Sequence, residues 1–252
     1  MEALSFGQYE LIYNAFSFGI ATFFAATLYF WLGLSQVSNQ YKTAVVITGL
    51  VTFIAGYHYF RIFDSFSAAY DVVDGTVQAT GVAFNVAYRY VDWLLTVPLL
   101  LVELILVMNL SRSETVRKGF ALGGAAALMI LLGYPGEVSA GGIDGTRLVW
   151  GILSMIPFLY IVYSLFVGLS ASIANQPSEV RGLINVARWI VVLSWSFYPI
   201  VYFAPFVLPL DGGTATVVIE VGYTIADIVA KAAFGVLIFT IAVRKSNLGS
   251  AS

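Results

Sequence analysis

The chain has 252 residues, of which 60% are hydrophobic and 10% are charged, whereas roughly a quarter of the residues are charged in an ordinary soluble domain. This composition excludes a water-soluble fold, the formal net charge of −2 excludes a basic surface for nucleic acid, and the lack of cysteine excludes disulfides, thiolate metal sites and cysteine nucleophiles. A transmembrane helix needs about 20 mostly apolar residues, so seven such helices would use most of this length. We therefore expect residues 1–252 to form a single membrane domain.

Seven apolar stretches follow one another along the chain, separated by short polar breaks such as DVVDGTVQATG and GEVSAGGIDGT. A transmembrane β-barrel would instead show alternating segments of about ten residues. The sequence therefore predicts an all-α integral membrane protein with a seven-transmembrane-helix bundle. The stretches span residues 9–35, 43–64, 86–109, 116–134, 147–170, 183–207 and 216–243.

Basic residues near the helix ends predict the orientation, because they gather on the cytoplasmic side. If the N-terminus is outside, the outer side holds only Arg61 and Arg147. We therefore predict an external N-terminus, a cytoplasmic C-terminus and a multi-pass location in the plasma membrane. The cytoplasmic side then holds Lys42, Arg112, Arg117, Lys118, Arg181, Arg188, Arg244 and Lys245, and the outer loops hold Asp64, Asp71, Asp74, Glu137, Asp144 and Asp211.

Ionisable residues inside the apolar stretches are candidates for function, because a charge in hydrocarbon costs several kcal/mol by most estimates. Asp227 and Lys231 lie four residues apart in the seventh stretch, so a helix places them on one face, about 6 Å apart along its axis. One interpretation is a buried ion pair that fixes helix packing. The other is a lysine that reacts with an aldehyde to form a Schiff base. The spacing alone leaves both open.

The third stretch carries two carboxyl groups, Asp92 and Glu103, separated by roughly three helical turns and about 16 Å. Thr96 shares their face. This separation is too large for two carboxyls that share a proton, but it suits two proton stations on either side of a central group. Alternatively, Glu103 is neutral and only bonds a neighbouring helix. Arg89, one turn outside Asp92, is either a gate or a side chain that snorkels to the interface.

His58 is the only histidine, so no second histidine supports a metal site, and we expect no metal. Taken alone, a single histidine in a membrane helix is more often a packing residue than a titrating one. Glu220 lies near the outer mouth of the seventh stretch, where the sequence offers no partner for it. The proton-release group is therefore left unassigned.

Three segments together resemble the third, sixth and seventh helices of the microbial (type 1) rhodopsins. They are RYVDWLLTVPLLLVE at 89–103, WSFYPIVYF at 195–203 and DIVAK at 227–231. The residues Asp92, Thr96 and Glu103 give the Asp-Thr-Glu pattern of the proteorhodopsins. GYHYFRIF, with the third-stretch run, is similar to the xanthorhodopsin and Gloeobacter-rhodopsin branch. The resemblance covers all seven stretches and implies all-trans retinal bound as a protonated Schiff base.

The resemblance also implies a role for each ionisable residue. It assigns Lys231 as the retinal-bearing lysine, Asp92 as the proton acceptor and counterion, and Asp227 as the second counterion. Glu103 corresponds to the proton donor and His58 to a partner of the acceptor. The positions that match the retinal pocket are Trp93, Met129, Gly133, Trp150, Trp195, Tyr198 and Pro199, and further candidates are Tyr90, Thr96, Ser154 and Ala230. Leu100 occupies the position where this family switches colour, and leucine there resembles the green-absorbing members.

The three stations of the third helix, at positions 92, 96 and 103, carry different residues in members of this family with different functions. Two of the three are carboxylic acids in this chain. A sodium pump of this fold would carry Asn, Asp and Gln at the three stations, and a chloride pump would lack the carboxyl of Asp92. We therefore expect a light-driven outward proton pump, which is a transporter and not an enzyme. The alternative is a photosensory rhodopsin that signals through a partner. Besides protons and the lipid bilayer, we expect a homo-oligomer and no nucleic-acid partner.

Gly151 suggests a second chromophore. The xanthorhodopsin branch carries a glycine at this position, where it opens a window onto the retinal ring. A hydroxylated carotenoid could then cover the gap from outside, against the fifth and sixth helices. Tight helix packing is the alternative role of this glycine.

Overall fold

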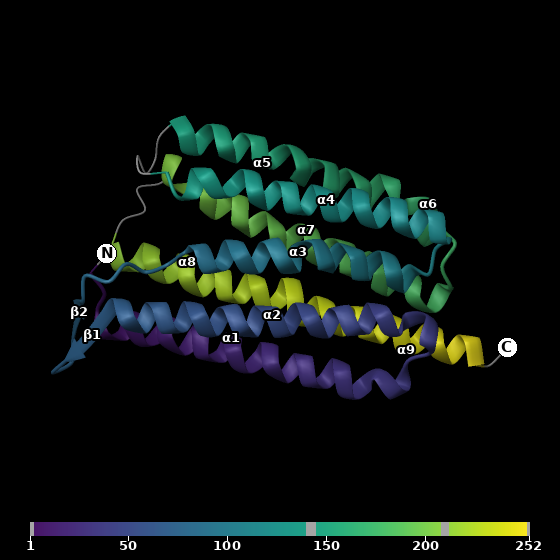
Figure 1. The fold of residues 1–252 in the computed structure, drawn as a ribbon, viewed down its shortest axis with the longest axis horizontal. Helices are drawn as coiled ribbons and strands as arrows, with labels where there is room; N and C mark the ends of the chain where they lie inside the picture. The colour runs from purple at the N-terminus through teal and green to yellow at the C-terminus, as the bar shows by residue number, and fades with distance from the viewer. Residues whose placement is uncertain (1–2, 140–144, 208–211, 251–252) are drawn as a thin grey trace.

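The computed structural model describes residues 3–139, 145–207 and 212–250, which form a bundle of seven long membrane-length helical spans (Figure 1). The seven predicted spans are confirmed, and most extend a few residues beyond the apolar stretch. Asp144 and Asp211, which we predicted in outer loops, lie outside the described residues. The helices are α1 (Phe6–Leu32), α2 (Asn39–Ala69), α3 (Ala87–Met108), α4 (Arg112–Glu137), α5 (Gly145–Tyr163), α6 (Ser170–Ala174), α7 (Ser178–Phe203), α8 (Gly212–Asp227) and α9 (Phe234–Ser250).

Two of the spans contain a π-helical turn. The turn Ser164–Gly168 joins α5 to α6, and the turn Ile228–Ala233 joins α8 to α9. Short 3-10 turns follow α1 at Gly33–Gln36 and α7 at Ala204–Phe206. Such single π-helical turns inside α-helices are frequent at functional sites, and the second of them carries Lys231.

One predicted loop is in fact a β-hairpin. The polar break after the second span forms β1 (Tyr70–Val73) and β2 (Thr76–Ala79), which pair antiparallel. Asp74 and Gly75 connect them with φ angles of 49° and 73°. An Asp-Gly pair with both φ angles positive makes the tight turn that suits the twist of a hairpin, so the sequence contained a signal that the loop prediction missed.

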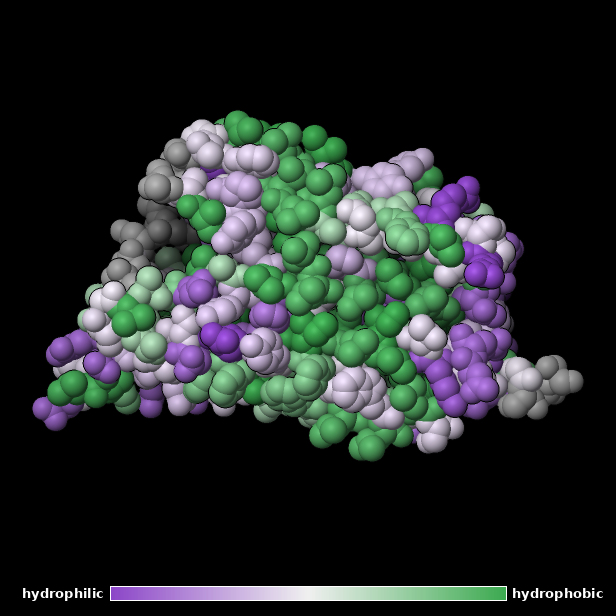
Figure 2. Space-filling model, in the orientation of Figure 1, coloured by the Kyte–Doolittle hydropathy of each residue, from purple (hydrophilic) through white to green (hydrophobic). Residues whose placement is uncertain are grey.

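The outer surface of the bundle is apolar along its middle. Leu32 and Phe120 are 78% and 80% exposed, which would be costly in water and is favourable in lipid. Figure 2 shows hydrophobic residues across the middle of the molecule and hydrophilic residues gathered toward its ends. The two termini lie at opposite ends of the bundle (Figure 1), as an odd number of spans requires.

The interior consists of two hydrophobic clusters that meet at one carboxylate. The larger cluster includes Trp93 on α3, and the smaller includes Tyr59 on α2. Both side chains donate a hydrogen bond to Asp227 at the end of α8. The polar site therefore lies at the boundary of the two clusters, inside an otherwise apolar bundle.

Candidate functional site

A buried lysine between two carboxylates forms the centre of the site. The Lys231 amine lies 2.5 Å from Asp92 Oδ2 and 2.9 Å from Asp227 Oδ1, and all three side chains are 1% exposed. The sequence placed Asp227 and Lys231 on one helix face, and the structure adds Asp92 from α3 on the other side of the amine. Removing one partner from such a buried group costs about 3–5 kcal/mol, because it leaves a charge unpaired.

The two carboxylates have different surroundings. Asp227 accepts hydrogen bonds from Tyr198 Oη at 2.6 Å, Tyr59 Oη at 2.9 Å and Trp93 Nε1 at 3.2 Å. Asp92 bonds Lys231 through one oxygen, while its Oδ1 has no hydrogen-bond partner among the described residues. The ionised form of Asp227 is therefore stabilised by three fixed donors that Asp92 lacks.

A second buried ion pair lies further toward the hairpin end of the bundle, where Arg89 is about one helical turn before Asp92 and Glu220 about two turns before Asp227. The Arg89 guanidinium donates to both carboxyl oxygens of Glu220, and the two side chains are 4% and 7% exposed. The Arg89 guanidinium carbon also lies 4.9 Å from the centre of the Tyr223 ring. The sequence offered no partner for Glu220; the structure shows that its partner is Arg89.

Glu103 is isolated on the opposite side of Lys231. It is fully buried, and neither carboxyl oxygen has a hydrogen-bond partner among the described residues. A lone carboxylate in such surroundings would cost several kcal/mol, which favours the neutral acid at rest. Between the two acids, Thr96 donates to the backbone oxygen of Asp92 at 2.8 Å.

His58 is buried in the half of α2 that leads to the hairpin, with its ring edge-on to that of Tyr57. Its Nδ1 has no hydrogen-bond partner among the described residues, and neither has Asp92 Oδ1. Within the described residues, therefore, no direct hydrogen bond joins His58 Nδ1 to Asp92. The pairing of these two residues stays a prediction.

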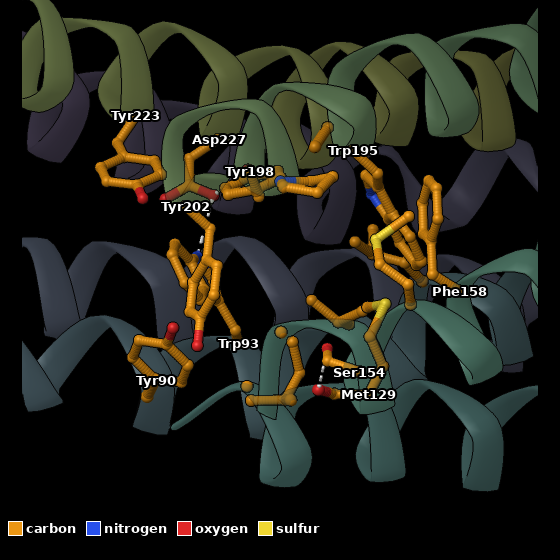
Figure 3. A pocket seen from close by; sticks show the side chains of 18 of the residues that line it. Tyr90, Trp93, Met129, Ser154, Phe158, Trp195, Tyr198, Tyr202, Tyr223 and Asp227 are labelled. Atoms are coloured by element: carbon orange, nitrogen blue, oxygen red, sulfur yellow. Dashed lines mark hydrogen bonds between the residues drawn. The ribbon is translucent and has the colours of Figure 1, made fainter. Parts of the chain in front are cut away.

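An apolar pocket extends from Lys231 between α3, α4, α5 and α7 (Figure 3). Trp93 and Trp195 line it with Tyr198, and Ser154 donates to the Met129 backbone oxygen at 2.7 Å. The other predicted pocket residues that line it are Tyr90, Leu100, Gly133, Gly151, Pro199 and Ala230. Two predicted candidates, Trp150 and Thr96, do not line it; the Trp150 Cβ lies instead beside Gly136.

Gly151 is enclosed by aromatic rings. A Cβ atom at this position would lie 2.5 Å from the Tyr202 ring and 2.7 Å from the Phe203 ring, closer than real Cβ contacts allow. The two rings thus occupy the space that we expected to be a gap in the wall. Gly151 has a packing role here and also lines the pocket.

Several pocket residues were missed in the sequence. Met155 and Phe158 follow Gly151 and Ser154 at helical spacing on α5, so the face of that helix could have identified them. Tyr223 lies one turn before Asp227 and could have been found in the same way. The full set that the sequence did not identify is Val97, Ile130, Met155, Phe158, Tyr202, Phe203 and Tyr223.

Comparisons with known proteins agree with this geometry. The family described as bacteriorhodopsin-like protein matches residues 11–245. The green-light absorbing proteorhodopsin of gamma-proteobacterium EBAC31A08 is 32% identical over 242 residues, covering 93% of this chain and 88% of the relative. Bacteriorhodopsin of Halobacterium salinarum is 31% identical over 239 residues, covering 92% of this chain and 83% of the relative.

Two solved structures are similar over nearly the whole chain. Xanthorhodopsin, described as a light-driven ion pump with dual chromophore, shares 49% identity and a TM-score of 0.95 over 99% of both chains. Thermophilic rhodopsin shares 45% identity and a TM-score of 0.94, again over 99% of both chains.

Proposed function

The chain belongs to the bacteriorhodopsin-like protein family, in the proteorhodopsin and xanthorhodopsin branch, and on this premise we propose that it is a light-driven pump that moves protons outward across the plasma membrane. The observation that carries the proposal is the Lys231 amine between Asp92 and Asp227, at the end of an apolar pocket. No cluster suited to a metal ion occurs among the described residues.

The pocket fits the retinal that this family implies. It is lined mainly by aromatic and aliphatic side chains and ends at the buried Lys231 amine. An amine is the group that reacts with the aldehyde of retinal to form a Schiff base. Its two carboxylates supply the counter-charge that a cation at this nitrogen needs. Retinal on Lys231 would supply light absorption and a change of shape that redirects the proton on the lysine nitrogen.

The protein then provides the stations for the proton. Asp92 is the proposed acceptor, because its Oδ2 is 2.5 Å from the Lys231 nitrogen and its other oxygen has no partner among the described residues. Asp227 is the proposed second counterion, because three hydrogen-bond donors hold it in place beside Lys231. Glu103 is the proposed donor, since a neutral acid on the opposite side of Lys231 can return a proton to it. This order moves protons from the predicted cytoplasmic side outward.

The test is to express the protein in cells, add all-trans retinal, and record visible absorbance and the pH of the medium under illumination. We expect a pigment and light-dependent acidification that a protonophore abolishes. Lys231→Ala should give no pigment, and Asp92→Asn should give a pigment that does not pump. If Asp92→Asn acidified the medium at the parental rate, the assignment of the acceptor would be wrong.

We also propose the second chromophore that the sequence suggested, a hydroxylated carotenoid against α5 and α7. Two facts support it: the similarity to xanthorhodopsin, described as having a dual chromophore, and the position of Gly151, which lines the pocket and packs against the Tyr202 and Phe203 rings. The polyene would lie against Tyr202 and Phe203, not in an open gap. The homo-oligomer, the absence of a nucleic-acid partner and the single-domain organisation stay predictions.

A further inference from the structure

A second buried lysine lies near the end of α9, roughly four helical turns beyond Lys231. The Lys245 amine donates to the backbone oxygens of Val107 and Met108 at 2.9 and 3.0 Å, and to Gln176 Oε1 at 2.8 Å. The residue is 7% exposed. In the sequence it was only one of the basic residues that indicated the cytoplasmic side.

The contacts of this amine favour its charged form. An ammonium group has three N–H donors, and here each meets one of three acceptors, whereas a neutral amine has only two donors. The face of the Tyr41 ring lies 5.0 Å away and adds a favourable contact for a cation. Among the ion pairs of the described residues none involves Lys245, so no carboxylate neutralises it.

The cation lies at the negative end of α3. This helix ends at Met108, and Asn109 takes a left-handed conformation with φ 52°, so the last carbonyls of the helix lack intrahelical partners. Glu103 is on the same helix, one turn before Val107 and so about 6 Å from it along the axis. An anion so near a helix C-terminus is destabilised by the helix dipole, and a cation there offsets this effect.

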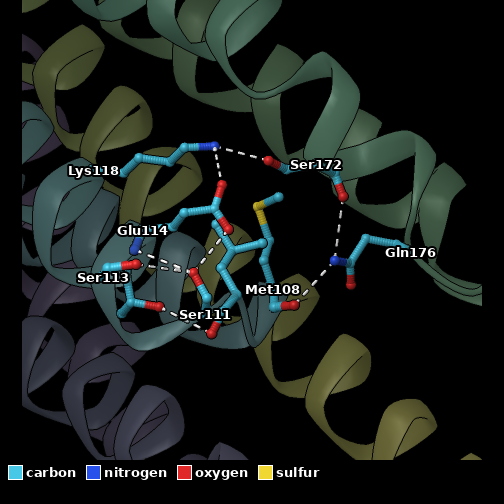
Figure 4. A network of polar contacts seen from close by, with 9 residues as sticks. Met108, Ser111, Ser113, Glu114, Lys118, Ser172 and Gln176 are labelled. Carbon is cyan, nitrogen blue, oxygen red and sulfur yellow. Dashed lines mark hydrogen bonds and ion pairs between the residues drawn. The ribbon is translucent and has the colours of Figure 1, made fainter.

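A set of hydrogen bonds holds the cation in place. Gln176, in the turn between α6 and α7, accepts a hydrogen bond from Lys245. It also donates to Met108 O at 3.0 Å and to Ser172 O at 3.3 Å (Figure 4). Lys118 of α4 donates to Ser172 Oγ at 2.8 Å. The position of Lys245 is thereby tied to the ends of several helices.

We propose that Lys245 is a positioning residue for proton transfer, whose charge stabilises Glu103 while that acid is ionised. This inference rests on the proposed function, in which Glu103 must lose its proton and regain it in every cycle. Neither carboxyl oxygen of Glu103 has a hydrogen-bond partner among the described residues, and no cation pairs with it, so the charges at the nearby end of α3 contribute to how costly its ionised form is. Lys245 lowers that cost without touching the carboxyl group.

The experiment compares three replacements of Lys245 and one control. Lys245→Met removes charge and donors, Lys245→Gln removes the charge but keeps donors, and Lys245→Arg keeps the charge. The control is Arg244→Gln, because Arg244 is the adjacent cation but is exposed and donates to the backbone oxygen of Glu179 at 3.2 Å. Each protein is purified with retinal and followed by time-resolved infrared spectroscopy after a flash.

The readout is the carbonyl band of protonated Glu103, assigned by its loss in Glu103→Gln. We expect this band to disappear about five- to tenfold more slowly in Lys245→Met and Lys245→Gln. A charge at a helix end contributes about 1 kcal/mol, which corresponds to a change in rate of this order. Lys245→Arg and Arg244→Gln should stay within about twofold of the parent. If Lys245→Met formed no pigment, Lys245→Gln would carry the comparison.

Three results would overturn the inference: a parental or faster rate in Lys245→Gln, equal slowing in Lys245→Arg, or equal slowing in Arg244→Gln. The first result would show that the hydrogen bonds of residue 245 are sufficient for the parental rate. The second would show that the charge of residue 245 does not determine the rate, and the third would show that the effect is not specific to the buried cation. Failure of the proposed function would be seen separately, because the parent protein would then not acidify the medium in light.

Discussion

Replacing Glu220 by glutamine removes the carboxylate that pairs with Arg89 and should destabilise the protein strongly. Breaking a buried ion pair by removing one partner costs about 3–5 kcal/mol. The glutamine oxygen can still accept one hydrogen bond from the guanidinium, which recovers about 1 kcal/mol. The rings around Arg89, including Tyr223, are unchanged in the variant and so do not alter the difference. We therefore expect a loss of about 2–4 kcal/mol in the free energy of unfolding.

The assay is a double-mutant cycle with Arg89→Gln, Glu220→Gln and the double variant, which isolates the energy of the pair. Unfolding is followed in detergent by the loss of helical signal and of the visible band. The matched control is the Arg147–Glu137 pair at 3.0 Å, whose side chains are 13% and 23% exposed. Because this pair is more exposed than Arg89–Glu220, solvent screens it more strongly, and this second cycle should give a smaller coupling.

The reasoning would be refuted by a coupling between Arg89 and Glu220 that is no larger than that of the control pair. Such a result would mean that the bundle adapts to the lost charge, for example by turning Arg89 toward Asp92. A shift of the visible band in Glu220→Gln would reveal that movement, since the counterions lie around Lys231.

Three further outcomes are expected. Glu103→Gln should slow the recovery of the visible band after a flash and make the recovery depend on pH, with little shift of the band itself; unchanged recovery would remove Glu103 from the proton path. His58→Asn should move the pH at which Asp92 changes between its protonated and ionised forms, read from the colour of the pigment, and identical titration curves would leave His58 a packing role. Gly151→Trp should abolish the contribution of an added hydroxylated carotenoid to the excitation spectrum of retinal fluorescence, and the carotenoid proposal fails if the parent binds none or if transfer survives the tryptophan.

The spans and the lysine–carboxylate pair could be predicted because they depend on local patterns. Apolar stretches of sufficient length define the helices, and a four-residue spacing places Asp227 and Lys231 on one face. The hairpin was missed because the polar break was read by its composition, although Asp74 and Gly75 have the residue types of a tight turn.

The partners across the bundle could not be predicted, because they depend on how helices pack. Arg89 and Glu220 are 131 residues apart, and nothing between them indicates that their helices meet. One physical signal was present, since two ionisable residues at similar depth in a membrane tend to pair. The burial of Lys245 was harder to predict, because it depends on contacts with the end of α3 and with Gln176 in the turn between α6 and α7.

The charges in the bundle explain why proton transfer to Asp92 and proton transfer from Glu103 depend on different groups. Toward the hairpin end, Arg89 and Lys231 are cations and Asp92, Asp227 and Glu220 are anions, so a proton that passes from Lys231 to Asp92 leaves the total charge of the cluster unchanged. When Glu103 gives up its proton, a new charge appears on oxygens that have no hydrogen-bond partner and no paired cation among the described residues. Transfer on that side is therefore limited by the cost of an unpaired anion. A cation fixed one helical turn beyond that acid, as Lys245 is, lowers this cost and still leaves the acid neutral at rest.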